Sequence, residues 1–347
     1  MHPTEVEYEM KFAPNWLSRR ALIWCLAASI ALNCGLAIIL LDDYQFRSYG
    51  LLHPAFSRLS DEDSQLIGFR FSTNHGALHD QLKRNYPQFT QGTAGLYFEM
   101  LNNGGSVGIN ENLRLIPGSL RKIPLLAATM KGVEQGRFKL SDIVVIQNRH
   151  LDLALGVENA VGPLAAGGAG QKLTIRQLIE AITTHSDNTA TMALLERVGY
   201  EAYADAMFAM GISWKTWREN FEGGRMIDFP ASTYEFAQLF HALYFSSYLR
   251  PKHSQAILDL LGHSEFRDGI PAGVPPGVMV AHKTGDWRYG EYHHDCGIIY
   301  YPEKNYALCI MIKGVDKTNA NKLISEISRD VFSYVQSAKP FGLPSEK

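Results

Sequence analysis

Residues 21–41 form an uncharged apolar run that constrains the chain more than any other feature. At the rise of an α-helix, such a run crosses a hydrocarbon core of about 30 Å. An Arg-Arg pair directly precedes the run, and an Asp-Asp pair directly follows it. Because basic flanks stay in the cytoplasm, we expect residues 1–20 inside and residues 21–41 as a single-pass anchor in the cytoplasmic membrane. The rest of the chain would lie outside, in the periplasm where an outer membrane is present.

Two alternatives to an uncleaved anchor remain open. The apolar stretch of a cleaved signal peptide spans only ~7–15 residues, which is shorter than this run. A lipoprotein signal is disfavoured because Cys34 follows Asn33, where that signal has a small residue, and because the apolar run continues past it. The length of the run therefore favours an anchor that is retained.

The composition is that of a globular protein with a large core. The chain has 347 residues, of which 46% are hydrophobic and 20% charged. These values exclude a disordered chain, a disulfide-rich miniprotein and a collagen-like repeat. The net charge of −2 shows no basic excess, so we expect no nucleic-acid partner.

Of the four cysteines, two lie in the apolar run, whereas Cys296 and Cys309 flank an expected turn. A hairpin loop at residues 302–305 would place Cys296 opposite Met311 and Cys309 opposite Ile298. The two cysteines would then be diagonal neighbours with Cβ atoms roughly 7 Å apart, too far for an unstrained bridge. This register predicts two buried thiols, although a shifted register in an oxidising compartment would permit a bond.

Strand patterns occupy both ends of the part that follows the anchor, and helical patterns occupy its middle. The expected strands are residues 92–101, 106–116, 277–285, 296–301 and 306–314, and the expected helices are residues 173–185, 189–198, 236–245 and 321–335. This order predicts an α+β fold in which N- and C-terminal strands build one antiparallel sheet beside a helical lobe. We expect a juxtamembrane connector and opening helix at residues 42–90, one domain at residues 91–337 and a tail at residues 338–347.

A serine and a lysine stand one helical turn apart in Pro117-Gly118-Ser119-Leu120-Arg121-Lys122. If a helix begins near Ser119, both side chains share one face, and the Ser119 hydroxyl can meet the Lys122 amine. A serine nucleophile needs such a neighbouring base. The helix N-terminus also offers N–H groups that suit an oxyanion. Taken alone, the pattern is more often a capping serine with a solvated lysine.

Two further polar triplets indicate a function only when they are considered together with the Ser119–Lys122 pattern. Ser186-Asp187-Asn188 lies between two helical patterns, where it would usually cap helices. Lys283-Thr284-Gly285 closes a strand pattern, where its glycine can mark the close approach of a ligand or another backbone.

Ser-x-x-Lys, Ser-Asp-Asn and Lys-Thr-Gly occur once each and in this order. The trio is the signature of class A β-lactamases and penicillin-binding proteins. Over roughly residues 90–337 the chain resembles this superfamily of serine hydrolases, whose fold matches the expected layout. Residues 91–337 would then be a β-lactamase-like hydrolase domain.

The resemblance implies catalytic roles for three side chains and two backbone groups. Ser119 would be the acylated nucleophile, Lys122 its general base, and Ser186 the group that passes a proton to the leaving nitrogen. The oxyanion hole would be the backbone N–H groups of Ser119 and Asp286. Asp286 departs from the small or hydroxyl residue that is usual there.

The resemblance also implies how substrate would be held. Asn188 would bind the substrate amide, and Lys283 and Thr284 would bind its carboxylate. A Lys283 ammonium could lower the pKa of Lys122 by like-charge repulsion. Gly285 would let the strand lie against the substrate.

A base for deacylation is not evident in the sequence. Class A β-lactamases carry a Glu-x-x-x-Asn loop, and the candidates here are Glu219 and Glu222. Neither is followed by asparagine four residues later. Glu219, Glu222 or neither could serve, and without such a base an acyl-enzyme should persist.

No cofactor or metal ion is expected. His293 and His294 are adjacent on a strand pattern and would point to opposite faces, so they cannot readily share one ion.

Two classes of function follow. The first is an anchored serine hydrolase acting on β-lactams or on the D-Ala-D-Ala end of cell-wall peptides, either as a β-lactamase or as a slow D,D-peptidase or penicillin-binding protein. The second is a non-catalytic cell-wall or β-lactam sensor that is acylated or occupied without turnover.

Overall fold

The computed structural model describes Ser29, Asn33 and residues 75–157, 162–213, 229–287 and 292–337. The chain divides into two compact units, residues 1–51 and 52–347. In the first, Ser29 and Asn33 are helical, and the side-chain amide of Asn33 donates to the Ser29 carbonyl at 2.8 Å. Most of residues 21–41 lie outside the described part. Among the described helices, none is both long and apolar enough to cross a membrane.

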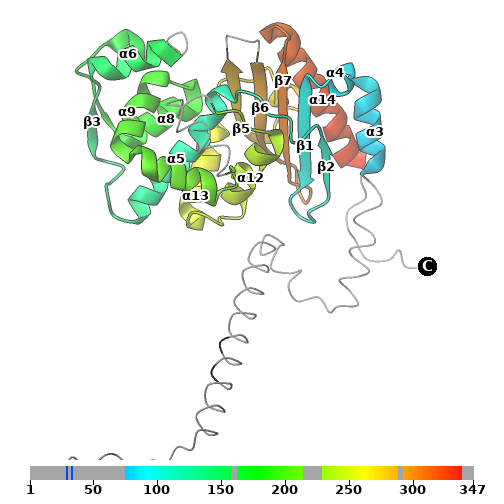
Figure 1. Cartoon of the computed structure of the whole chain (residues 1–347), viewed down its shortest axis with the longest axis horizontal. Coiled ribbons are helices and arrows are strands. Elements are labelled where there is room, and N and C mark those ends of the chain that lie inside the picture. The colour runs from blue at the N-terminus through cyan, green and yellow to red at the C-terminus, as the bar shows by residue number, and fades with distance from the viewer. Residues whose placement is uncertain are drawn as a thin grey trace, which may run out of the picture. The chain divides into compact units, whose positions relative to one another are not determined.

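The second unit is built around a five-stranded sheet in the order β2-β1-β7-β6-β5. Its strands are β1 (Ala94–Met100), β2 (Ser106–Ile109), β5 (Met279–Trp287), β6 (Tyr292–Tyr300) and β7 (Tyr306–Lys313). Every neighbouring pair is antiparallel. β1 pairs with β7, so the sheet joins the two ends of the domain, and this confirms the α+β prediction (Figure 1).

The remaining elements of the described residues are mostly helical. They are α3 (Gly76–Asn85), α4 (Pro87–Thr90), η2 (Gly118–Arg121), α5 (Lys122–Glu134), β3 (Ile143–Val145), α6 (Asn148–Val157), α7 (Leu164–Gly167), β4 (Lys172–Thr174), α8 (Ile175–His185), α9 (Asn188–Val198), α10 (Tyr200–Ala209), α12 (Thr233–Tyr244), α13 (Pro251–Leu261), η3 (Ile270–Gly273) and α14 (Lys317–Ser337).

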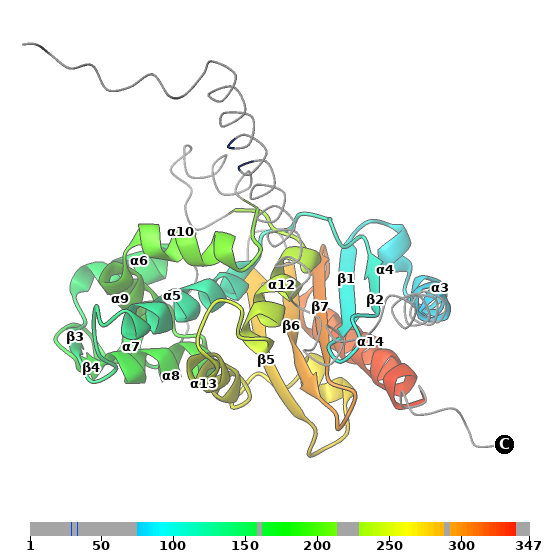
Figure 2. The same ribbon diagram turned by 90° about the horizontal axis from the view of Figure 1, so that it is seen from below.

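The sheet separates two hydrophobic cores. Along β7, Ile310 and Ile312 face one core, while Cys309 and Met311 face the other, as strand alternation requires. The first core also takes in α3 and α14, whose apolar faces cover one side of the sheet (Figure 2). The opening helix α3 therefore packs as part of the domain, with Leu78 and Leu82 fully buried. The second core lies between the sheet and the helical lobe.

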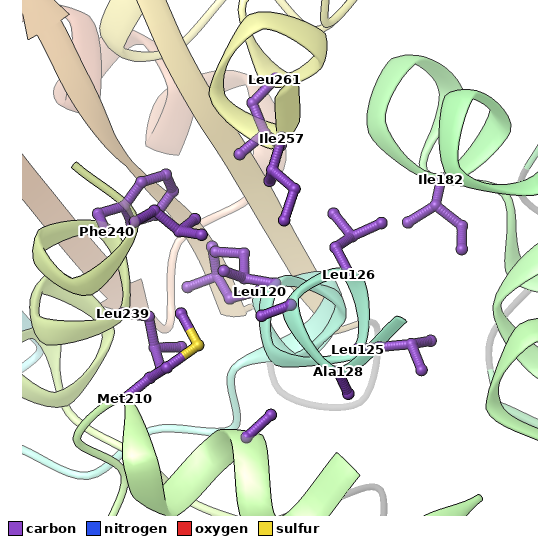
Figure 3. Packing of buried hydrophobic residues seen from close by; sticks show 14 of the residues in the cluster. Leu120, Leu125, Leu126, Ala128, Ile182, Met210, Leu239, Phe240, Ile257 and Leu261 are labelled. Atoms are coloured by element: carbon purple, nitrogen blue, oxygen red, sulfur yellow. The ribbon is translucent and has the colours of Figure 1, made fainter. Parts of the chain in front are cut away.

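Helix α5 is the centre of the lobe. Its residues are buried on nearly every side, as expected for a helix surrounded by others. Figure 3 shows Leu125 and Leu126 of α5 among side chains of α8, α12 and α13. Because α5 begins at Lys122, this packing fixes the segment that carries the Ser-x-x-Lys motif.

Capping residues set the helix boundaries. A capping box formed by Ser232 and Glu235 opens α12. A second box, from Thr174 and Gln177, opens α8. Leu173, which we expected on the helix, instead lies on β4. The predicted helix near Ser119 begins with a 3-10 turn before α5.

The prediction of two free thiols at Cys296 and Cys309 is wrong. The structure joins them in a disulfide, because they lie directly opposite each other on β6 and β7. The turn between β6 and β7 starts earlier than expected, because the last pair of residues before it is Ile299 with Tyr306. It also contains Glu303 in the left-handed region, at φ 62°. The register of β6 against β7 is therefore shifted by two residues from the expected one. As a result, Cys296 pairs directly with Cys309 instead of lying diagonal to it.

Candidate active site

Ser119 lies in a short 3-10 turn between the sheet and the lobe. Gly118 precedes it at φ +54°, and a side chain there would overlap the backbone carbonyl of Asp286. The Lys122 N–H donates to the Ser119 carbonyl, which closes the turn. Ser119 is 8% exposed, so the turn holds its hydroxyl in a largely enclosed position.

Lys122 is directed into the junction of α8 and α9. Its Nζ donates to the Ser186 carbonyl at 2.6 Å, to Ser186 Oγ at 3.0 Å and to Asn188 Oδ1 at 2.8 Å. The residue is only 1% exposed. Burial of an amine is tolerated because these oxygens replace water.

Lys283 approaches the same hydroxyl from β5. Its Nζ lies 2.9 Å from Ser186 Oγ and 3.1 Å from the Thr284 carbonyl. It also lies 5.6 Å from the centre of the Phe266 ring, within the range of a cation–π contact. Like Lys122, Lys283 is 1% exposed. Ser186 Oγ therefore bridges the two lysines.

The Ser186-Asp187-Asn188 triplet both ends one helix and starts the next. Ser186 is the C-cap of α8 in the left-handed region, at φ 55°. Asp187 caps α9, accepting from the Ala190 N–H at 2.7 Å, and its second oxygen accepts from the Leu164 N–H at 2.9 Å. Asp187 is thus structural, and it fixes the residues on either side of it.

Asn188 offers an unused donor. Its oxygen accepts from Lys122, whereas its Nδ2 is buried and has no hydrogen-bond partner among the described residues. A buried donor without a partner is costly. This N–H group is therefore an unused donor within the cluster formed by Lys122, Ser186 and Asn188.

Two glycines let β5 approach the Ser119 turn. A side chain at Gly285 would overlap the Pro117 carbonyl and contact Leu120. Together with the contact of Gly118 on Asp286, this brings the backbone of β5 against the turn. The space beside Gly285 is thus occupied by the protein's own backbone.

The side chain of Asp286 is held by His293 and Lys317. Its oxygens lie 2.7 Å from His293 Nδ1 and 3.0 Å from Lys317 Nζ. Burial alone would raise the pKa of this carboxyl, but His293 and Lys317 outweigh it and lower the pKa to about 2. Only the backbone of Asp286 is engaged with the Ser119 turn.

The sequence analysis missed His294 as a support of the site. Its Nε2 donates to the Ile116 carbonyl at 2.8 Å, and its Nδ1 accepts from the Ile312 N–H at 3.2 Å. Burial lowers the pKa of His294 to about 4, so the ring is neutral at pH 7. It ties β6 to the residue before Pro117. No local pattern marks this role, because His294 and Ile116 are 178 residues apart.

The sequence analysis also considered two glutamates and a pair of adjacent histidines. Glu219 and Glu222 lie outside the described residues. His293 and His294 contact Asp286 and Ile116 respectively. Within the part of the chain that the structure describes, no group of three or more His, Cys, Asp and Glu residues could hold a metal ion.

The fold and the three assembled motifs define a member of the superfamily of β-lactamases and penicillin-binding proteins. The model of the β-lactamase enzyme family matches residues 77–335, and the chain belongs to that family.

A curated relative is also a β-lactamase. Beta-lactamase 3 of Bacillus cereus is 28% identical over 156 residues, which are 43% of this chain and 49% of that protein. The matched region thus spans about half the length of this relative.

Solved structures share the fold. A β-lactamase from Sphaerobacter thermophilus has a TM-score of 0.62 at 21% identity, covering 74% of this chain and 99% of that one. A PBP-A variant, described as an acyl-enzyme complex with penicillin G, has a TM-score of 0.61 at 24% identity, covering 74% and 98%.

Proposed function

We propose that the protein is a membrane-anchored serine hydrolase that is acylated at Ser119 by a β-lactam or a D-Ala-D-Ala-type amide and then releases the acyl group to water. The observation that carries this proposal is the position of Ser186 Oγ between Lys122 and Lys283. A hydroxyl has two acceptor lone pairs and one proton. When both lysines donate to Ser186 Oγ, its proton is left to be donated to another group.

Acylation would proceed in two steps. Ser119 Oγ attacks the acyl carbon while its proton passes to the unprotonated Lys122 amine, and the oxyanion accepts from the N–H groups of Ser119 and Asp286. The C–N bond then breaks, and the leaving nitrogen takes a proton through Ser186, which regains one from Lys122. Water later attacks the ester, releases the acid and restores Ser119.

Substrate would be held at both ends of the reacting bond. The unpartnered Nδ2 of Asn188 suits the carbonyl of the acylamido side chain. Lys283 and Thr284 supply an ammonium and a hydroxyl for the carboxylate. The penicillin G adduct of the PBP-A variant is consistent with this substrate class.

Slow turnover is the second candidate. The sequence carries no Glu-x-x-x-Asn after Glu219 or Glu222, which favours a D,D-peptidase or penicillin-binding protein whose acyl-enzyme persists. A sensor that is acylated or occupied without any turnover is the limiting case of such a slow enzyme.

The test is a time course of the full chain with a chromogenic cephalosporin, followed by absorbance and intact mass. We expect a covalent adduct on the wild type and none on Ser119→Ala. Ser254→Ala is the matched control, because the Ser254 hydroxyl is buried without a partner in the described residues. Many turnovers would support a β-lactamase, and a single burst would support the slow enzyme. Absence of any adduct on the wild type would overturn the assignment of Ser119.

We further propose that residues 21–41 anchor the protein with residues 1–20 in the cytoplasm. The uncharged run and its basic flank support this arrangement. The full chain should stay in the membrane pellet after carbonate extraction, and protease added outside should digest the catalytic domain. Recovery of an intact chain in the carbonate supernatant would contradict the anchor.

A further inference from the structure

A cavity of about 540 Å³ lies at the far end of α5 from Ser119. Its lining residues come from the last turn of α5, the loop that follows, α8 and α13. Figure 2 labels these three helices in the lobe. Its size falls within the range of pockets that take small molecules. Met130 lines it, about 12 Å along the helix axis from Lys122, so the cavity is separate from the candidate active site.

The deep wall of the cavity is apolar. Met130, Phe138 and Ile179 line it and are buried. Phe138 packs on Gly132 of α5, where a side chain would overlap its ring. Arg197 lies 5.1 Å from the ring centre. These contacts hold Phe138 in place, and they form a wall suited to an alkyl chain.

The mouth of the cavity is cationic. Lys139, Arg176 and Lys252 line it and are exposed. Among the described residues, none of these three side chains makes a hydrogen bond or an ion pair. The nearby carboxylate of Glu134 is already used by the Arg250 N–H, His253 and Lys131. Three positive charges therefore border an apolar cavity.

Two of these cations occupy unfavourable positions in their helices. Arg176 lies in the first turn of α8 and Lys252 in the first turn of α13, and neither turn contains an acidic residue. A helix N-terminus carries partial positive charge, so a cation there is repelled. A bound anion would relieve this repulsion at both helices.

We propose that this cavity binds a single-chain carboxylate amphiphile, such as a medium-chain fatty acid. The alkyl chain lies against Met130, Phe138 and Ile179, and the carboxylate lies among Lys139, Arg176 and Lys252. The site is independent of acylation at Ser119.

The test is photolabelling of the full chain with dodecanoic acid that carries a diazirine near the end of its chain. The labelled peptides are identified by mass spectrometry. We expect insertion into the peptides that contain Met130, Phe138 or Ile179, and at least tenfold less with the matching neutral dodecanol probe. A tenfold difference corresponds to about 1.4 kcal/mol.

Three variants separate the two parts of the site. R176E/K252E should lower labelling about tenfold, whereas K322E/R329E, with the same charge change on exposed positions of α14, should leave it unchanged. A256F keeps the cations but fills the cavity that Ala256 lines, and it should also lower labelling.

The proposal is overturned if the neutral probe labels equally, if labelling falls elsewhere, or if R176E/K252E labels like the wild type. Competition distinguishes the source of the anion. Unlabelled dodecanoate should displace the probe, whereas displacement by phosphatidylglycerol vesicles and not by dodecanoate would replace the proposed ligand with a membrane lipid.

Discussion

At the scale of single residues, the site depends on one hydroxyl with two lysine neighbours. Lys122 and Lys283 come from different parts of the fold and meet at Ser186 Oγ. Each amine is buried but surrounded by oxygens. Two ammonium groups this close would repel each other in a medium of low dielectric constant, which favours the unprotonated Lys122 of the proposed acylation. The arrangement is more readily explained by a chemical role than by a contribution to stability.

Replacing Ser186 should separate chemistry from backbone strain. Ser186→Ala and Ser186→Gly both remove the hydroxyl, so we expect both to slow acylation about 10²–10⁴-fold. Because residue 186 sits in the left-handed region, glycine should be about 1 kcal/mol more stable there than alanine. Stopped-flow acylation rates and urea unfolding measure the two effects. An acylation rate of either variant close to that of the wild type would contradict the proposed proton transfer.

His294 should make stability depend on pH. Its pKa in the folded state is about 4, below the ordinary value of 6.5. The unfolded state binds the proton more tightly, so the stabilisation is complete above pH 6.5 and is lost as pH falls toward 4. The free energy of unfolding should change by at most about 1.4 kcal/mol per pH unit in this window.

His294→Asn should flatten this dependence, and unfolding titrations at several pH values would detect the change. The exposed His263 provides the control, because His263→Asn should leave the slope as it is in the wild type. If both variants retain the wild-type slope, burial of His294 is not its source.

At the scale of elements, the site depends on how β5 meets the Ser119 turn. Gly118 and Gly285 remove the side chains that would hold the two segments apart. A hydrogen bond from His294 Nε2 to the Ile116 carbonyl also joins β6 to the segment that precedes the Ser119 turn. The relative position of the Ser119 and Asp286 N–H groups follows from this contact.

Gly285→Ala should damage catalysis more than stability. Its added methyl group overlaps the Pro117 carbonyl, so the strand or the turn must shift. We expect about 1–3 kcal/mol of destabilisation and at least a 10²-fold slower acylation. Gly76→Ala is the control, since nothing lies within 4 Å of a side chain there. Equal acylation rates for both variants would argue against the role of this contact.

The disulfide should stabilise the sheet. Cys296 and Cys309 are 13 residues apart, and closing a loop of this size contributes roughly 3 kcal/mol in the chain-entropy account. C296A/C309A should therefore lower the free energy of urea unfolding by about this amount. Adding reductant should destabilise the wild type similarly and leave the variant unaffected. A wild type that is insensitive to reductant would show that the bond does not form in solution.

Much of the site could be predicted from sequence because its motifs are local. Ser119 and Lys122, Ser186 and Asn188, and Lys283 with its neighbours each form a short pattern. The structure brings one or two members of each pattern together, because Lys122 and Lys283 both meet Ser186 and Lys122 also meets Asn188.

The features that the sequence did not reveal depend on the register of strands or on distant contacts. The disulfide was missed because the hairpin turn begins earlier than its Pro-Glu-Lys-Asn segment suggests. His294 was missed because its partners Ile116 and Ile312 become neighbours only in the folded sheet.

At the scale of the whole molecule, the candidate site is shared between the two halves of the domain. The lobe supplies Lys122 and Ser186, and the sheet supplies Lys283 and the Asp286 backbone. Neither the lobe nor the sheet alone contains all the groups of the candidate active site.

Acylation should therefore be lost together with the structure of both halves. In a urea titration of the full chain, far-UV circular dichroism and the initial rate of acylation should have coincident midpoints, as for a cooperative transition. Acylation that ends at a clearly lower urea concentration would show that the sheet and the lobe separate before they unfold.

The pairing of β1 with β7 also determines when the protein can fold during its synthesis. Ala94 on β1 pairs with Ile312. Pairing of β1 with β7 is therefore delayed until roughly two hundred further residues have been translated. At about 5–20 residues per second, the delay is on the order of 10 s or more. Through this interval β1 can pair only with β2, and its other edge is open. The nascent chain thus carries an unprotected strand edge until its last strand emerges from the ribosome.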